Sequence, residues 1–194
     1  MALWPRQVLL IFGFKPPYDG LRSPEFASAK AALASALPAW SIRVFAPDDI
    51  TALLEKPVHL STQLSELVSN VMQCTKCKWV EKNDVARLVC LIDVGGLVLD
   101  ILDVRLLDFG AQNMDKYRTS LFLVNGNSTS QCVEPDIVGG NAGDIVFLDI
   151  LREICHRLGS RKAFTLATGP MWSICGSWEK IVRARTPKVC CPHA

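Results

Sequence analysis

Residues 83–103 read NDVARLVCLIDVGGLVLDILD, and this stretch decides the fold that the sequence predicts. Apolar side chains recur in it at helical spacing, at Val85, Leu88, Val89 and Ile92. That spacing is typical of a helix with one face in a core. Gly95 and Gly96 should end the helix, because glycine takes up a left-handed cap at little steric cost. The apolar residues 97–102 then predict a buried strand, so the helix leads directly into a strand.

Four charged residues of the same stretch are candidates for a binding site. Asp84 and Arg87 lie three residues apart and therefore share a face of the predicted helix, with Asp84 in the first turn, where negative charge is favoured. We expect this face to be exposed to solvent. Asp100 and Asp103 fall in or just after the predicted strand, where a carboxylate is costly to bury unless it is paired or bound to a metal ion. Ligands of open α/β sheets bind at the carboxyl ends of the strands, so we expect the four side chains to meet there.

The remaining elements, taken in chain order, predict an α/β domain. Residues 7–14 (QVLLIFGF) are continuously apolar, which is typical of a central parallel strand. The other predicted elements are a helix over 24–37, a strand over 41–46, a helix over 48–56 capped by Asp48, a helix over 61–73, a polar connector over 74–81, a strand over 121–124 and a helix over 144–158 capped by Asp144. This order favours a mostly parallel, twisted sheet flanked by helices. No linker or internal repeat divides the chain, so residues 1–194 are expected to form a single domain.

The composition argues against several classes of protein. The formal net charge is +2, which gives no reason to expect nucleic acid as a partner. No stretch reaches the roughly 18 apolar residues of a membrane span, and the apolar run over 8–14 is interpreted as a strand rather than a signal peptide. Cys90 and Cys155 lie within apolar helical patterns and are predicted to be buried free thiols. We therefore expect a cytoplasmic location and no membrane span.

The residues of the central stretch resemble the sugar-binding region of GT-A glycosyltransferases, which carries a DXD motif. The likeness is to the Och1-like mannosyltransferase and capsular-polysaccharide transferase group and, more distantly, to the large clostridial glucosylating toxins. In these families the pattern is roughly S-D-x-x-R-x-x-x-L-x-x-x-G-G-x-Y-x-D-x-D. The residues in register with it are Asp84, Arg87, Leu91, Gly95, Gly96 and Asp100.

The resemblance extends, in order, over roughly residues 6–172. In these families the base of the nucleotide-sugar donor stacks on a segment after the first strand. A later T-G-P sequence also belongs to the donor-binding site. The matching donor-binding positions are Phe12, Gly13 and Phe14 after the first strand, and Gly169 and Pro170 in the T-G-P. Asp136 stands where the families usually have asparagine, and the resemblance places it on the acceptor side.

The resemblance implies a transferase that moves a sugar from a nucleotide-diphosphate sugar to a glycan or other hydroxyl acceptor. It implies retention of the anomeric configuration by front-side displacement, with no protein nucleophile. Asp84 and Arg87 would bind the donor, since a carboxylate accepts hydrogen bonds from sugar hydroxyls and a guanidinium donates hydrogen bonds to phosphate. Mn²⁺ or Mg²⁺ held by Asp100 and Asp103 would neutralise the departing diphosphate. The double glycine would belong to the donor side as well.

The spacing of the two acids leaves a second interpretation open. The position in register with the second aspartate of the motif is Leu102, and Asp103 follows Asp100 by three residues. Side chains alternate along a strand, so Asp100 and Asp103 converge only if the backbone turns or bulges between them. The alternative is a non-catalytic module that binds nucleotide-sugar or glycan through a degenerate motif.

The cysteines offer a third interpretation. Cys74 and Cys77 have the spacing of a metal site, which Cys191 and His193 could complete. The chain would then be a zinc-stabilised interaction protein.

Overall fold

The computed structural model describes residues 5–11, 14, 24–99, 121–124 and 133–159. The strands among them are β1 (Gln7–Ile11), β2 (Ser41–Phe45), β3 (Gly96–Leu99), β4 (Leu121–Val124) and β5 (Val133–Gly140). The helices are α1 (Pro24–Ala36), α2 (Pro47–Glu55), α3 (Thr62–Gln73), α4 (Trp79–Val94) and α6 (Ile145–Gly159). Strands and helices alternate in the first part of the chain, and this confirms the predicted α/β class.

The described strands form one sheet in the order β2-β1-β3-β5-β4. β1 is parallel to both of its neighbours, β2 and β3, with Val8 beside Ile42 on one side and Leu97 on the other. β5 runs antiparallel to β3 and to β4. The prediction that residues 7–14 contain a central parallel strand is therefore confirmed over Gln7–Ile11. The prediction from sequence did not include β5.

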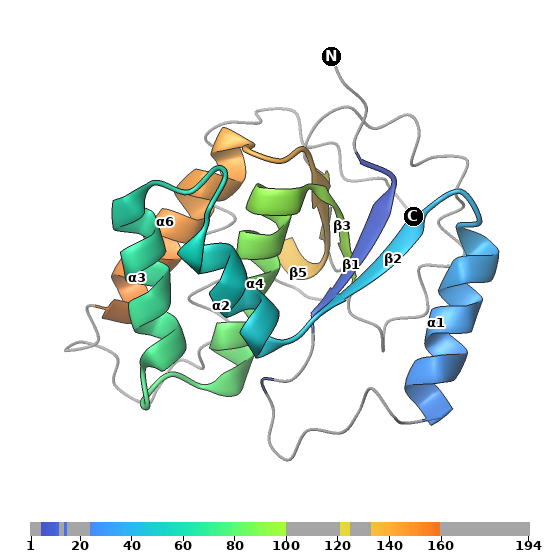
Figure 1. The fold of residues 1–194 in the computed structure, drawn as a ribbon, viewed down its shortest axis with the longest axis horizontal. Coiled ribbons are helices and arrows are strands. Elements are labelled where there is room, and N and C mark those ends of the chain that lie inside the picture. Colours follow the sequence, from blue (N-terminus) through green and yellow to red (C-terminus); the bar gives the residue numbers. More distant parts are fainter. Residues whose placement is uncertain (1–4, 12–13, 15–23, 100–120, 125–132, 160–194) are drawn as a thin grey trace.

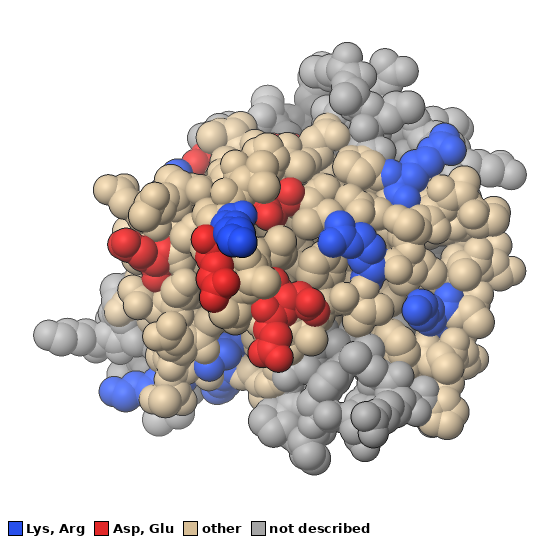
Figure 2. Space-filling view, in the orientation of Figure 1, with Lys and Arg blue, Asp and Glu red and all other residues tan. Residues whose placement is uncertain are grey.

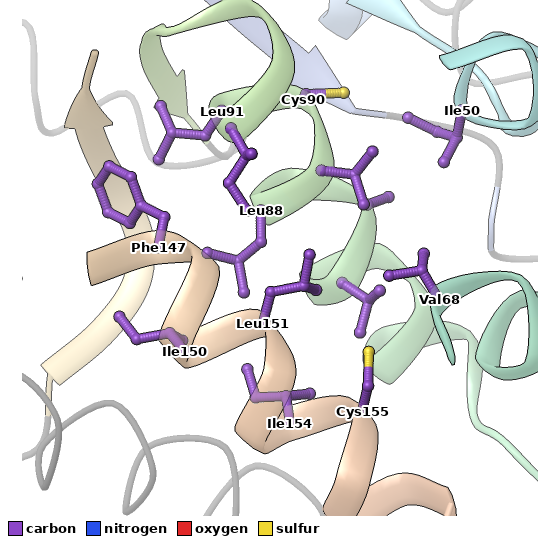
Figure 3. Packing of buried hydrophobic residues seen from close by; sticks show 14 of the residues in the cluster. Ile50, Val68, Leu88, Cys90, Leu91, Phe147, Ile150, Leu151, Ile154 and Cys155 are labelled. Atoms are coloured by element: carbon purple, nitrogen blue, oxygen red, sulfur yellow. The ribbon is translucent and has the colours of Figure 1, made fainter. Parts of the chain in front are cut away.

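The sheet is covered by helices on both faces (Figure 1). Side chains alternate across a strand, and both sides of β1 are buried. Leu9 and Ile11 belong to the larger core beneath α2, α3, α4 and α6, whereas Val8 and Leu10 belong to a smaller core with α1. Figure 3 shows part of the larger core, where labelled side chains of α4 and α6 meet Ile50 of α2 and Val68 of α3.

α4 lies in the middle of the larger core. The predicted core positions Val85, Leu88, Val89 and Ile92 are all buried, and Cys90 and Leu91 are buried as well. The sheet covers one side of the helix, while α6, α3 and α2 pack around the others. Every residue from Asp84 to Ile92 is buried, so α4 is the central helix of this core.

The double glycine joins α4 to β3 in a very tight space. Gly95 has φ 73° and Gly96 has φ 108°, both in the region that favours glycine. A Cβ atom at Gly96 would lie 2.5 Å from the Gln7 carbonyl oxygen, and one at Gly95 would lie 2.7 Å from the Ala142 nitrogen. The glycines therefore let α4 end directly against β1 and against the turn that follows β5.

The carbonyl groups at the end of α4 accept hydrogen bonds from neighbouring segments. The Gln7 side-chain amide donates to the Val94 oxygen at 3.0 Å and to the Gly95 oxygen at 3.2 Å. The Gly143 N–H donates to the Ile92 oxygen at 2.8 Å. These carbonyls have no partner within the helix, so bonds from outside satisfy them and fix the helix end in place.

Two predicted helix starts are wrong by a few residues. α4 begins at Trp79, because the Lys78 N–H donates to the Glu81 carboxylate at 2.7 Å in a capping arrangement. Asp84 therefore lies in the second turn of α4. α2 begins at Pro47, and it is Asp49, not Asp48, whose carboxylate accepts the Ala46 N–H at 2.8 Å.

The predictions for the last helix are confirmed. The Asp144 carboxylate accepts the Val146 N–H at 2.9 Å at the start of α6. The predicted core face is buried, at Phe147, Ile150, Leu151, Ile154 and Leu158.

Candidate functional site

The candidate site lies at the carboxyl end of the parallel strands. Because β1, β2 and β3 run in the same direction, their last residues, Ile11, Phe45 and Leu99, point to the same end of the sheet (Figure 1). We call this the carboxyl end of the sheet, and the opposite end, with Gln7 and Gly96, the amino end. Ligands of open α/β sheets bind at the carboxyl end. Asp100 is the next residue of the chain after Leu99.

α4 brings Asp84 and Arg87 to this same end. The helix turns back into β3 at Gly95, so its amino-terminal half returns toward the carboxyl end of the sheet (Figure 1). Helical rise places Arg87 about 13 Å and Asp84 about 18 Å from the glycine turn, while β3 extends about 10 Å from it. Both residues therefore lie level with the end of β3 or just beyond it.

Asp84 and Arg87 form a buried ion pair. A guanidinium nitrogen of Arg87 lies 3.6 Å from a carboxylate oxygen of Asp84. Asp84 is 5% and Arg87 8% exposed, so the expectation of a solvent-facing stripe is wrong. Both side chains are buried because the sheet, α2, α3 and α6 pack around α4 between Asp84 and Ile92. A separation of 3.6 Å is that of an ion pair and is longer than a good charged hydrogen bond.

Glu81 is a further buried carboxylate on α4, one turn before Asp84. It is 2% exposed, and its carboxylate accepts the Lys78 N–H. Glu81 stands three residues after the N-cap, which is the spacing of a capping box, although Lys78 is not a typical capping residue. The start of α4 thus carries a fixed, hydrogen-bonded acid next to the Asp84–Arg87 pair.

β5 brings Asp136 to the carboxyl end of the sheet. β5 runs antiparallel to β3, and Ile137 pairs with Leu99, the last residue of β3. Asp136 precedes Ile137 and therefore stands, by register, beside the point where β3 ends. Asp84, Arg87 and Asp136 thus lie at one end of the sheet although Asp136 is far from the other two in sequence.

The double glycine lies at the other end. Gly95 and Gly96 pack against Pro5 and Gln7 at the amino end of the sheet, away from Asp84 and Arg87. Their predicted donor contacts do not fit this position. We assign both residues to the fold, where their backbone conformation and lack of a side chain are required.

The other predicted site residues are described only in part. Phe14 lies just beyond β1, half-buried against the larger core. The remaining donor-side and metal positions, Phe12, Gly13, Asp100, Asp103, Gly169 and Pro170, lie outside the described residues.

The cysteines show no reactive site in the described part of the chain. Cys74, Cys77, Cys90 and Cys155 are free thiols. Burial raises the pKa of Cys155 to about 12, and burial also raises the pKa of Cys90 well above its ordinary value. Both thiols therefore stay protonated at neutral pH, and the prediction of buried free thiols is confirmed for them.

The residues proposed for zinc are only partly described. Cys74 follows α3 and is half-buried, Cys77 is buried, and Cys191 and His193 lie outside the described residues. Within the described ranges, no group of three or more metal-ligating side chains comes together. None of the helices in those ranges is long and apolar enough to cross a membrane.

The α/β sheet of this order between helices resembles a GT-A glycosyltransferase fold. The structure is similar to that of PaToxG glycosyltransferase, with a TM-score of 0.59 and 12% sequence identity. The match covers 95% of this chain and 70% of that chain. At this identity the likeness establishes the fold alone. The sequence matches no protein-family model and no curated protein.

Proposed function

We propose that this chain is a glycosyltransferase that moves a sugar from a nucleotide-diphosphate sugar to a glycan or other hydroxyl acceptor. The observation that carries the proposal is the buried Asp84–Arg87 pair at the carboxyl end of a GT-A-like sheet. The fold alone hosts more than one activity, so the function is argued from these side chains.

Asp84 and Arg87 would bind the two halves of the donor. A guanidinium presents a rigid fork of donors that suits phosphate, and it stays charged at any working pH. A carboxylate accepts hydrogen bonds from sugar hydroxyls. Because both side chains are buried and already oriented by α4, little side-chain freedom remains to be lost when the donor binds.

Asp100 and Asp103 are the proposed ligands of Mn²⁺ or Mg²⁺. Carboxylate oxygens suit these hard cations, and Asp100 follows directly on the last residue of β3. The carboxylate oxygens of the two residues therefore suit the Mn²⁺ or Mg²⁺ ion that the fold implies. When bound, the ion would supply positive charge to the departing diphosphate.

The acceptor would approach beside Asp136. In the proposed reaction the bond from the anomeric carbon to the phosphate oxygen breaks, and a bond to the acceptor oxygen forms on the same face. The proton of the acceptor hydroxyl passes to the departing phosphate oxygen. Arg87 would hold the diphosphate, and Asp84 would hold the sugar ring in place during this exchange.

The test is release of free nucleotide from a panel of UDP and GDP sugars, with Mn²⁺ and with excess chelator. Asp84→Asn and Arg87→Lys should each lower kcat/KM by about tenfold or more, because each removes a charged hydrogen bond or its fork geometry. α6 supplies the matched control, since Asp149 and Arg152 form an exposed pair with the same spacing and order. Asp149→Asn and Arg152→Lys should leave the rate unchanged. Equal rates in all four variants would refute the assignment of Asp84 and Arg87.

The role of the two acids is tested by Asp100→Asn and Asp103→Asn. If the backbone turns between them so that both hold the ion, each variant should lose metal-dependent nucleotide binding while remaining folded. Full transfer activity in excess chelator would contradict the proposed metal role.

The alternative function is a non-catalytic module that binds nucleotide-sugar or glycan. Leu102, in register with the second acid of the motif, is the observation that favours it. A ligand that binds only the native state raises the melting temperature. A shift with UDP or GDP and Mn²⁺, without release of nucleotide from any donor, would establish the module and reject the transferase.

A further inference from the structure

The segment that joins α3 to α4 carries an exposed tryptophan among lysines. Trp79 is 43% exposed, and Lys76 and Lys78 beside it are exposed as well. Lys82 follows one turn later on α4 and is half-buried. We call Lys76, Lys78, Trp79 and Lys82 the Trp79 patch. Figure 2 shows lysine or arginine side chains at the lower left of the molecule, in the region where Figure 1 places this segment.

The local structure turns these side chains outward. Cys77 is buried, and its N–H donates to the Cys74 oxygen at 3.4 Å, which fixes the turn between α3 and α4. Cys77 therefore anchors the turn in the core, while the lysines on either side of it stay at the surface. Trp79 is the first residue of α4 and is held by the start of the helix.

Positive charge predominates in the sequence of this segment. Its three lysines are accompanied, between residues 74 and 82, by one acid, Glu81, which is buried and accepts the Lys78 N–H. The amino terminus of α4 adds the positive end of the helix dipole. The patch therefore presents an indole ring with lysine side chains close to it in the sequence.

We propose that the Trp79 patch binds the surface of membranes that contain anionic phospholipid. Tryptophan is favoured at the level of lipid headgroups, where its ring is apolar and its N–H is polar. Lysines near an anionic leaflet each strengthen binding, and their flexible stems let the charges reach the headgroups. A protein partner fits less well, because lysine is depleted from protein interfaces and one aromatic side chain offers little area.

The fold determines how a molecule bound through the Trp79 patch would be oriented on the membrane. The patch lies at the amino terminus of α4, which is at the carboxyl end of the sheet (Figure 1). A molecule bound through the patch therefore turns the ends of β1, β2 and β3 toward the membrane. This inference does not depend on the proposed transfer reaction, since it uses none of its site residues.

The experiment is co-sedimentation of the full chain with vesicles of phosphatidylcholine alone or with about 30 mole per cent phosphatidylserine. Wild-type protein should bind the anionic vesicles at low ionic strength and be released by salt, which screens the charges. Replacement of two lysines, Lys76→Gln with Lys78→Gln, should lower the partition coefficient about 25-fold, from about fivefold for each lysine. Lys30→Gln with Lys56→Gln makes the same charge change at exposed lysines elsewhere and should lower it less than about twofold.

Fluorescence tests the position of the ring. The chain has five tryptophans, so Trp79→Phe identifies the contribution of this one while keeping an aromatic side chain. A blue shift on addition of anionic vesicles to wild-type protein should be absent from Trp79→Phe.

Three results would overturn the proposal. The first is no binding to anionic vesicles at low salt. The second is an equal loss of binding in the control lysine pair, which would reduce the effect to net charge. The third is a preference for an acidic polypeptide such as polyglutamate over the vesicles, which would assign the patch to a protein partner.

Discussion

Gly96→Ala tests the junction of α4 and β3, where two effects act against a side chain. At φ 108° an alanine costs about 1–2 kcal/mol relative to glycine. Its Cβ would also lie 2.5 Å from the Gln7 carbonyl oxygen and 2.7 Å from Gln7 Cγ. The oxygen belongs to the backbone of β1 and cannot swing away, so relief of the overlap adds about 1–3 kcal/mol. We expect a loss of about 3 kcal/mol in the free energy of unfolding.

The assay is thermal unfolding followed by circular dichroism, with Gly159→Ala as the matched control. For a chain of this length a loss of about 3 kcal/mol lowers Tm by about 6–12 °C. Gly159 ends α6 without a positive φ, and a Cβ there would meet no atom within 4 Å. Gly159→Ala should therefore be neutral or stabilising by up to about 1 kcal/mol. A Tm for Gly96→Ala equal to that of Gly159→Ala would refute the reasoning.

The same variant separates the fold from the site. Gly96 lies at the amino end of the sheet, whereas Asp84 and Arg87 lie toward the carboxyl end. Gly96→Ala protein that is still folded at low temperature should bind nucleotide with the affinity of the wild type. Loss of nucleotide binding without loss of stability would instead show that Gly96 belongs to the donor-binding site.

Three further predictions concern the core and are checked by unfolding measurements. Gly140→Ala should destabilise the protein by about 1–3 kcal/mol, because an added Cβ would overlap the Phe147 ring, and chemical denaturation would show a lower midpoint. Ser65→Ala should stabilise it by about 1 kcal/mol, since the buried Ser65 hydroxyl has no hydrogen-bond partner among the described residues; an unchanged or lower Tm would contradict this. Stability should fall as pH rises from 9.0 toward 12, because the Cys155 thiol can ionise in the unfolded chain but is held protonated in the fold. Cys155→Ala should lessen that slope.

The join between α4 and β3 could be predicted because local chemistry decides it. The apolar spacing of the helix and the conformational freedom of the double glycine are both properties of a short stretch. The start of the helix was harder to predict, since Lys78 caps it through its backbone N–H and carries no typical capping side chain. The polar composition of residues 74–81 therefore favoured a connector over a helical turn.

The burial of Asp84 and Arg87 could not be predicted from their spacing. A pair three residues apart is usually an exposed helix pair, and only the packing of other elements around α4 changes that outcome. The place of Asp136 likewise depends on the pairing of β5 with β3, which joins segments far apart in the chain. Sequence pattern identifies such residues as candidates, whereas the register of the sheet decides which of them are neighbours.

The hydrogen bonds at the end of α4 indicate that the two ends of the sheet have different roles. Gln7, the double glycine and the Gly143 turn fix the end of α4 at the amino end of the sheet, whereas Asp84 and Arg87 lie toward the carboxyl end. Loops there can change length or composition while the helix that carries Asp84 and Arg87 keeps its position. For engineering, this makes the carboxyl-end loops the place to graft a new acceptor preference, and the amino end the place to add stability first.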